Sequence, residues 1–204
     1  MAQFSNKIQR IEDRPANEDV KTHVIGYHGC DLQVALEVVT RKEKLKPGTS
    51  RYDWLGTGAY FWEDDPHMAW LWAKHTAKQR PNIIKTPAVV GAVIDLTDCL
   101  NLIQTGTSKL LEAAYEALTQ EISRVGGNMP KNVSEEERYL DHAVFETLHE
   151  LRRRQRLPPF TSVRALFQSG ESVFPGSGIR KWDHIQVCVR DLTVIEGCFL
   201  ANAV

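Results

Sequence analysis

Residues 54–65 read WLGTGAYFWEDD: two glycines one residue apart run into an aromatic triplet, and the triplet runs into three acids. Glycines at this spacing mark a tight turn, or a place where another group approaches the backbone closely. The aromatic residues suit either a buried strand or the wall of a pocket for a flat ring. The stretch predicts a turn that enters a strand at 58–62 and leaves both roles open for its rings.

The chain has 204 residues, of which 42% are hydrophobic and 25% charged, and its net charge is −1. This is ordinary globular usage, and the length suits a single domain with a substantial core. The near-zero charge provides no global field that would steer the protein to nucleic acid or to an acidic membrane. The four cysteines form no C-x-x-C pair, and neither a signal peptide nor an apolar run of roughly 20 residues is present. We therefore expect a cytoplasmic protein with free thiols and no membrane partner.

Hydrophobic periodicity and turn residues divide the rest of the chain. Strands are predicted at 22–30, 58–62, 87–97, 162–168, 184–191 and 193–201. Helices are predicted at 31–45, 65–80, 108–126 and 134–157. The last helix is predicted to begin with a capping box of Ser134 and Glu137. This order predicts one α+β domain over 1–204, with a polar leader at 1–20 and a helical insertion at about 104–157.

Three stretches together carry a known pattern: GYHGC at 26–30, GTGAYF at 56–61, and the late strand that contains Gln186. In this pattern the chain resembles the ADP-ribosyltransferases of the diphtheria-toxin and poly(ADP-ribose) polymerase type. Their signature is a strand ending His-Gly-(Ser/Thr), then Gly-x-Gly-x-Tyr-Phe, then a late strand that begins with a catalytic Glu. The resemblance covers 22–78 closely and 160–200 loosely. It implies the family's split β-sandwich core with flanking helices and, here, a helical insertion.

The chain departs from this signature at two positions. Cys30 stands where Ser or Thr is usual, and Gln186 stands where the family has Glu. A glutamine supplies a hydrogen bond but no negative charge for a ribosyl cation, so some rate should be lost. The chain is therefore a His-Tyr-Gln variant of the His-Tyr-Glu signature, similar to bacterial toxin-like members.

The resemblance implies a site for NAD as co-substrate. In the family, the equivalent of His28 bonds the adenosine ribose, the backbone of Gly29 holds the nicotinamide carboxamide, and Tyr60 stacks on the nicotinamide ring. Gln186 contacts the other ribose, and His184, on the same strand face, is suited to accept a proton from the incoming nucleophile. The residues implied to line the NAD site are His28, Gly29, Cys30, Gly58, Tyr60, Phe61 and either Trp70 or Trp72.

Each of these assignments also has a plain structural interpretation. A Gly-x-Gly can be only a turn, the tryptophans suit a core, and Gln186 and His184 can be hydrogen-bonded strand residues. The loop at 168–183 offers Arg180, Lys181 and Trp182 as contacts for an acceptor, or is an ordinary Gly/Pro/Ser surface loop.

Two further patterns carry less information: the first allows two interpretations, and the second does not support a metal site. The run LRRRQRL at 151–157 suits either phosphate contact or a solvated helix end. His142, Glu146 and His149 share a helix face but fit no standard zinc motif, so we expect no metal.

The implied activity is mono-ADP-ribosyl transfer from NAD to a protein or nucleic-acid acceptor, in which the nicotinamide–ribose bond breaks. The habits of the family suggest a toxin of a toxin–antitoxin or phage-defence system, with an antitoxin protein as a further partner. Two alternatives stay open. One is a catalytically silent module that binds NAD or ADP-ribose, and the other is an interaction protein that docks a partner through its helical insertion.

Overall fold

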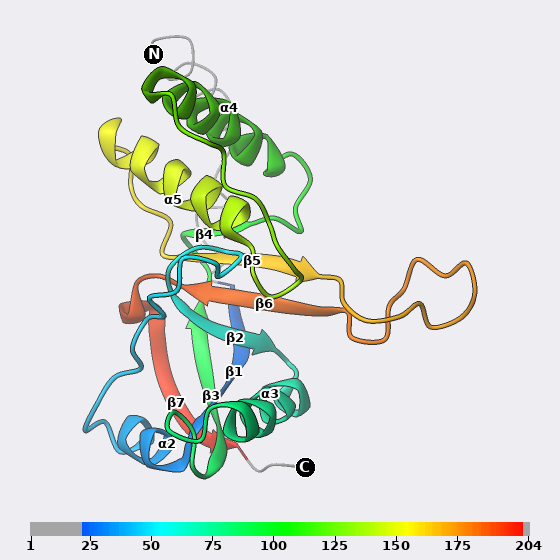
Figure 1. Ribbon diagram of the computed structural model, residues 1–204. Coiled ribbons are helices and arrows are strands. Elements are labelled where there is room, and N and C mark those ends of the chain that lie inside the picture. Colours follow the sequence, from blue (N-terminus) through cyan, green and yellow to red (C-terminus); the bar gives the residue numbers. More distant parts are fainter. Residues whose placement is uncertain (1–21, 202–204) are drawn as a thin grey trace.

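The computed structural model describes residues 22–201, so the leader predicted at 1–20 lies outside the described residues. The chain forms an α+β fold, as predicted, with a seven-stranded mixed sheet and four described helices (Figure 1). Its elements are β1 (His23–Asp31), α2 (Leu32–Val39), β2 (Ala59–Glu63), α3 (Pro66–Gln79), β3 (Pro87–Asp95), β4 (Cys99–Asn101), α4 (Ser108–Val125), α5 (Tyr139–Arg154), β5 (Ser162–Phe167), β6 (His184–Val189) and β7 (Ile195–Ala201), with a 3₁₀ turn at Leu192–Val194.

The sheet has two halves that are joined at one narrow seam. The strand order is β4-β5-β6-β2-β1-β3-β7, and every neighbouring pair is antiparallel except β4 with β5. The pairing between β1 and β2 consists of Gly26 with Glu63 and Tyr27 with Trp62. In Figure 1, β5 and β6 run across the view whereas β1, β3 and β7 run up it, so the halves turn steeply at this seam.

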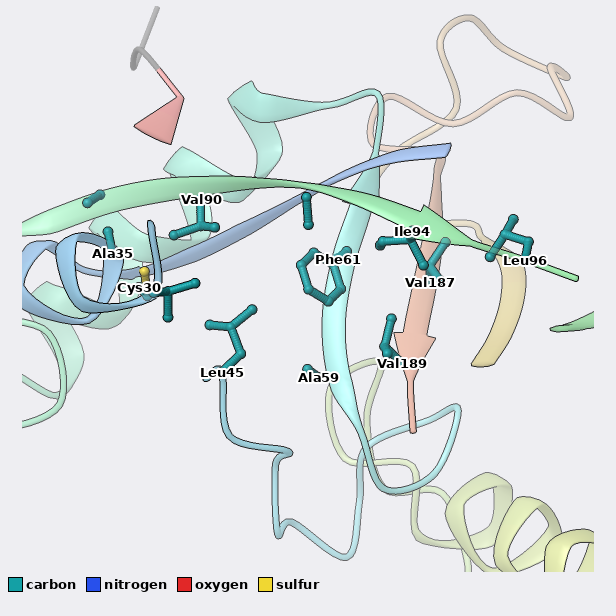
Figure 2. Close-up of a cluster of buried hydrophobic side chains, with 13 residues drawn as sticks. Cys30, Ala35, Leu45, Ala59, Phe61, Val90, Ile94, Leu96, Val187 and Val189 are labelled. Atoms are coloured by element: carbon teal, nitrogen blue, oxygen red, sulfur yellow. The ribbon is translucent and has the colours of Figure 1, made fainter. Parts of the chain in front are cut away.

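One hydrophobic core fills the face of the sheet that we call the inner face, which carries Phe61, Val90 and Val187. Side chains from both halves of the sheet and from α2 meet there (Figure 2). Phe61 is 0% exposed, and burying a side chain of this size contributes about 1.5–3 kcal/mol. Because Phe61 belongs to one half and Val90 to the other, this core holds the two halves together.

The opposite side of the sheet, which we call the aromatic face, carries Tyr60, Trp62 and Gln186. The α4–α5 pair covers its β4–β5–β6 end, where Leu148 of α5 packs on Val163 of β5. Helix α3 packs against β1 and β3 instead. The helical insertion therefore covers one end of the aromatic face, and α3 covers the other.

Two helix boundaries differ from those predicted. Helix α2 ends at Val39 rather than near residue 45, because Arg41 adopts a left-handed conformation with φ of +58° that a helix cannot continue through. Helix α5 begins at Tyr139, and the predicted capping box is wrong, because Ser134 accepts the N–H of Glu137 in a turn that precedes the helix. Asn132 caps α5 in its place.

The cap at α5 comes from outside the helix. Asn132 Oδ1 accepts the N–H groups of Leu140 and Asp141 at 3.0 and 3.2 Å. These N–H groups belong to the first turn, which has no intrahelical acceptors. Strand β4 was not predicted either, because three residues are too few to show a period of two.

Candidate functional site

Strand pairing places the predicted late-strand residues in one row across the aromatic face. Gln186 of β6 pairs with Ala165 of β5 on one side and with Trp62 of β2 on the other. Trp62 in turn pairs with Tyr27 of β1. Paired residues project from the same face, so Gln186, Trp62 and Tyr27 are neighbours. His184 lies two residues before Gln186 and projects from the same face.

The side chain of Gln186 is held by hydrogen bonds at both ends of its amide. Trp54 Nε1–H donates to Gln186 Oε1 at 2.7 Å, and Gln186 Nε2 lies 2.9 Å from His184 Nε2. His184 Nδ1 lies 2.6 Å from the carbonyl oxygen of Trp182, so this nitrogen donates. The network therefore fits the neutral Nδ1–H tautomer of His184, with Nε2 accepting from the amide. The amide keeps one N–H and one oxygen lone pair for a ligand.

An array of aromatic rings from five segments of the chain begins beside this amide. The ring centroids of Trp54 and Phe167 lie 5.0 Å apart, and those of Phe167 and His184 lie 5.3 Å apart. Trp62 continues the array, with centroids 6.3 Å from His184 and 6.0 Å from Trp72. These are ordinary spacings for aromatic contacts. Trp72 is 42% exposed, so the array ends in a tryptophan that is partly accessible from outside.

Strands β1 and β2 separate beside this array. Their pairing ends at Tyr27 and Trp62, and the same register continued would place Gly29 opposite Tyr60. The side chain of His28 spans the two strands instead, and its Nδ1 donates to the carbonyl oxygen of Tyr60 at 2.8 Å. The edge of β1 at Gly29 is thus paired with β3 but not with β2.

The structure places His28 and Gln186 on opposite faces of the sheet. Tyr27 shares the aromatic face, so the next residue projects from the inner face, where the His28 ring lies 5.6 Å from that of Phe61. Burial lowers the pKa of His28, and its hydrogen bond to Tyr60 offsets this only in part. The neutral ring donates through Nδ1 and keeps Nε2 as an acceptor. A ligand that touches both residues has to reach across the separation of β1 and β2.

Tyr60 lies on the aromatic face, but its hydroxyl is bound within its own turn. The hydroxyl donates to the carbonyl oxygen of Gly56 at 2.8 Å and accepts the N–H of Leu55 at 2.9 Å. Burial raises the pKa of Tyr60 far above its ordinary value, so the phenol stays protonated. The ring packs at the edge of the cluster that contains Phe145 and Cys188. Tyr60 is only partly buried, so it is not sealed within the core.

Gly29 lies directly beneath α3. A Cβ added there would collide with the carbonyl oxygen of Ala69 and lie 3.2 Å from Trp72 Cε3. Trp70 packs against the neighbouring cluster of Trp62, Ala69 and Val89 and is not among the nearest neighbours of an added Cβ at Gly29. Of the two tryptophans implied for the NAD site, the structure therefore brings Trp72, and not Trp70, to the backbone of Gly29.

The two glycines of the 54–65 stretch allow the turn that leads into β2. Gly56 has a φ of +84°, which glycine adopts at no steric cost. A Cβ added at Gly58 would collide with the sulfur of Cys188, so glycine lets β2 approach β6 closely. This packing accounts for Gly58 without any ligand.

An ion pair ties this turn to α5 and β6. Arg190 donates to Glu146 at 2.7 Å and to the carbonyl oxygen of Thr57 at 3.0 Å, and Glu146 accepts the N–H of Thr57 at 2.8 Å. Burial, the largest single influence, raises the pKa of Glu146, but the hydrogen bonds from Arg190 and Thr57 outweigh it and hold the pKa at about 2. Glu146 is thus a structural carboxylate.

Two residues implied for the NAD site lie in the core of the inner face. Phe61 is fully buried, as a supporting ring would be, and Cys30 is almost fully buried in the same cluster. Burial, followed by the charge of Asp31, raises the pKa of the Cys30 thiol to about 12. Both residues therefore influence the site through the position of their strands and not by contact.

The loop between β5 and β6 extends away from the sheet (Figure 1). Trp182 is 48% exposed and Arg180 is exposed as well. Lys181 Nζ is paired with Glu171 at 2.9 Å. Through its carbonyl oxygen, Trp182 also accepts from His184, so this loop is connected to the hydrogen-bond chain around the amide.

The arginine run at the end of α5 is engaged within the chain. Arg153 and Arg154 each pair with Glu150 at 2.6 Å. The Arg152 guanidinium lies 3.8 Å from the centroid of Phe160. These contacts favour the helix-end interpretation over phosphate contact.

Two features lie apart from the row of Gln186, Trp62 and Tyr27. His23, Asp95 and Glu196 bring atoms that could hold a metal ion within 4.8 Å of one another, at the end of β1 remote from Gly29. A cavity of about 450 Å³ lies between the end of α2 and β7. Neither feature includes a residue predicted for the site.

Three residues of the array were missed as site residues: Trp54, Trp62 and Phe167. Trp62 had a signal, because it lies two residues after Tyr60 and so shares its face. No signal in the sequence pointed to Trp54 or Phe167. Trp54 lies in a loop and Phe167 at the end of β5, and only the folded chain brings them to Gln186.

No family model matches the chain, and no solved structure matches it. It is similar to an uncharacterized protein of the archaeon Methanocaldococcus jannaschii, with 36% identity over 69 residues. The match covers 33% of this chain and 31% of that relative, so the chain spans about a third of the length of the curated relative it matches. In the part of the chain that the structure describes, no helix is long and apolar enough to cross a membrane.

Proposed function

We propose that the protein is a mono-ADP-ribosyltransferase, which cleaves NAD at the nicotinamide–ribose bond and transfers ADP-ribose to a macromolecular acceptor. The observation that carries the proposal is the juxtaposition of Gln186 with the separation of β1 and β2 at Gly29. Residues from opposite ends of the domain meet there on one face, through the pairing of Gln186 with Trp62 and of Trp62 with Tyr27. The sheet of two steeply turned halves supports the finer proposal of a split β-sandwich core.

The chemistry of the site suits cleavage of a glycosidic bond. Departure of nicotinamide leaves an oxocarbenium-like ribosyl cation, which a group at the ribose 2′-OH can stabilise. The oxygen of Gln186 has a lone pair left for that hydroxyl, and Trp72 offers a ring face for the nicotinamide. An amide dipole stabilises a cation less than a carboxylate does, so we expect slow turnover.

His184 has a different role from the one implied by the resemblance. Its Nε2 accepts the N–H of Gln186 and cannot take a proton from a nucleophile until that bond opens. In this arrangement His184 is a positioning residue, which orients the amide so that its oxygen faces Trp54. The acceptor would approach along the β5–β6 loop, where Arg180, Lys181 and Trp182 lie.

A second candidate is the silent module that binds NAD or ADP-ribose without cleaving it. The observation that favours it is the engagement of Gln186 at both ends of its amide, together with the lack of a carboxylate at this position. Turnover distinguishes the two candidates, because both require NAD to bind.

The test is the transfer of label from NAD that carries a tagged adenine, with wild type, Gln186→Ala and Gln120→Ala, an exposed glutamine on α4 as the matched control. We expect wild type and Gln120→Ala to label an acceptor in a cell lysate, and Gln186→Ala to label it at least about tenfold more slowly. Digestion with protease or nuclease then identifies the acceptor class. Binding of NAD without any transfer would favour the silent module, and lack of NAD binding by calorimetry would rule out both candidates.

A further inference from the structure

The cavity between the end of α2 and the start of β7 has the size of a ligand site. Its volume is about 450 Å³, and small-molecule sites typically enclose about 300–1,000 Å³. Its walls come from the end of α2, from the chain that follows α2, and from the segment 192–198. None of these residues belongs to the row of Gln186, Trp62 and Tyr27, so this cavity is separate from the candidate site on the aromatic face.

The floor of the cavity is apolar. Val38 and Leu45 line it and are buried in the inner-face core, and Leu192 and Ile195 line it and pack against the same core. Covering apolar surface contributes about 25 cal/mol per Å² that is removed from water. The cavity therefore suits a ligand with an apolar body.

Arg41 supplies a positive charge beside this apolar floor. It lines the cavity, and within residues 22–201 its guanidinium forms no ion pair and no hydrogen bond. Burial raises the pKa of the Cys198 thiol, which lines the same cavity, and the charge of Arg41 offsets part of this rise. Lys44 adds a second positive charge to the lining. A guanidinium can hold a carboxylate or a phosphate through two parallel hydrogen bonds.

Two acids also line the cavity, but they do not neutralise Arg41. Glu196 lies 3.1 Å from His23 and is paired with it. Glu43 is exposed to solvent. Among the described residues, Arg41 is the charged group that shifts the pKa of Cys198. The wall of the cavity at Cys198 thus favours a negative charge on the ligand.

We propose that this cavity binds a small amphipathic anion, with its apolar body against Val38, Leu45 and Ile195 and its carboxylate or phosphate head on Arg41. The inference goes beyond the proposed function and does not depend on it, because the cavity and the site around Gln186 share no residue. It gives the protein a second ligand site, whatever reaction the first one performs.

The test compares two arginines that share one backbone conformation. Arg41 follows α2 with a φ of +58°, and Arg156 follows α5 with a φ of +59°, but Arg156 does not line the cavity. Glycine adopts this conformation at no steric cost, so both Arg41→Gly and Arg156→Gly should fold. Arg156→Gly is therefore the matched control.

Binding is measured by calorimetry with octanoate, octyl phosphate and octanol on wild type and both variants. We expect wild type and Arg156→Gly to bind octanoate or octyl phosphate, and Arg41→Gly to bind the same anion about tenfold more weakly. The anion that binds more tightly identifies the head group. Octanol should bind more weakly than that anion to wild type. Lack of binding by both anions, equal binding by Arg41→Gly, or octanol binding as tight as that of the anions would overturn the proposal.

A second measurement locates the ligand on wild type alone. Saturation with the anion that binds should move the backbone amide NMR signals of Val39 and Cys198, which line the cavity. The signal of Gln120, an exposed residue on α4, should not move. Signals of Val39 and Cys198 that do not respond would place the anion elsewhere and overturn the proposal.

Discussion

Gln186 shows how a single side chain can be suited to its neighbours. Its oxygen accepts from Trp54 and its nitrogen donates to His184, so both halves of the amide are used. A carboxylate here would have no N–H for His184, so His184 Nε2 would have to donate instead of accept. The amide of Gln186 thus matches the tautomer of His184 in which Nδ1 donates to Trp182 and Nε2 accepts.

His149 is the residue for which a pH dependence is clearest. Burial, and then the charge of Arg190, lower the pKa of His149 to about 4, and Nε2 lies buried without a partner in the described residues. The unfolded chain therefore binds a proton near pH 6.5 whereas the folded chain does not. Stability is unaffected above that pH and falls as the pH decreases from 6.5 towards 4, by up to about 1.4 kcal/mol per pH unit.

Replacement of His149 by phenylalanine tests this assignment. His149→Phe keeps a ring against Phe160 and removes the titration, so the free energy of unfolding should depend less on pH between 6.5 and 4. The measurement is urea unfolding at a series of pH values. A variant whose pH profile is parallel to that of wild type would show that His149 does not titrate in this range.

At the scale of elements, α3 depends on small residues for its close approach to β1. Ala69 and Ala73 of α3 are fully buried, and Gly29 lies beneath them. With no Cβ on Gly29, the helix backbone can lie almost on the strand. This contact positions Trp72, and through it the open end of the aromatic array.

We expect Gly29→Ala to destabilise the protein by about 1–3 kcal/mol, because its methyl group would collide with the backbone of α3. Gly178→Ala is the matched control: nothing lies within 4 Å of its added Cβ, so the change should stay within about 0.5 kcal/mol. Chemical denaturation of both variants provides the comparison. Equal stabilities would mean that α3 can move away from β1 without loss.

At the scale of the whole molecule, stability depends on the core shared by the two sheet halves. Only two residue pairs connect β1 with β2, so the backbone contributes little across this seam. The inner-face cluster provides the remaining cohesion, and Phe61 lies at its centre (Figure 2). Because this core holds the two halves together, β1 and β2 can separate at Gly29 without loss of the fold.

Phe61→Ala should therefore cost about 3–5 kcal/mol, the range for a fully buried phenylalanine. Leu166→Ala provides a contrast, since Leu166 is 50% exposed on β5 and its loss should cost much less. Thermal unfolding would show both effects. A small loss for Phe61→Ala would indicate that the halves are held together by other contacts.

The sequence alone was sufficient for the α+β class, for six of the strands and for the existence of the four helices, because turn chemistry and apolar periodicity are local properties. It also placed Gln186 and His184 on one strand face, and Trp62 on the face of Tyr60. The sequence did not predict the early end of α2, because that end depends on the left-handed backbone conformation of Arg41. It did not predict the cap of α5 either, because Asn132 reaches the helix from a separate segment.

The tertiary structure alone decided which side chains meet. Strand order and register brought Gln186 beside Trp62, put His28 on the other face, and chose Trp72 over Trp70 as the neighbour of Gly29. The hydrogen bond from Trp54 to Gln186 joins residues that no local pattern connects. The alternation of polar and apolar residues in one strand defines its two faces, but it does not determine which strand lies beside it or in which register. Register depends on the packing of both faces of the sheet at once.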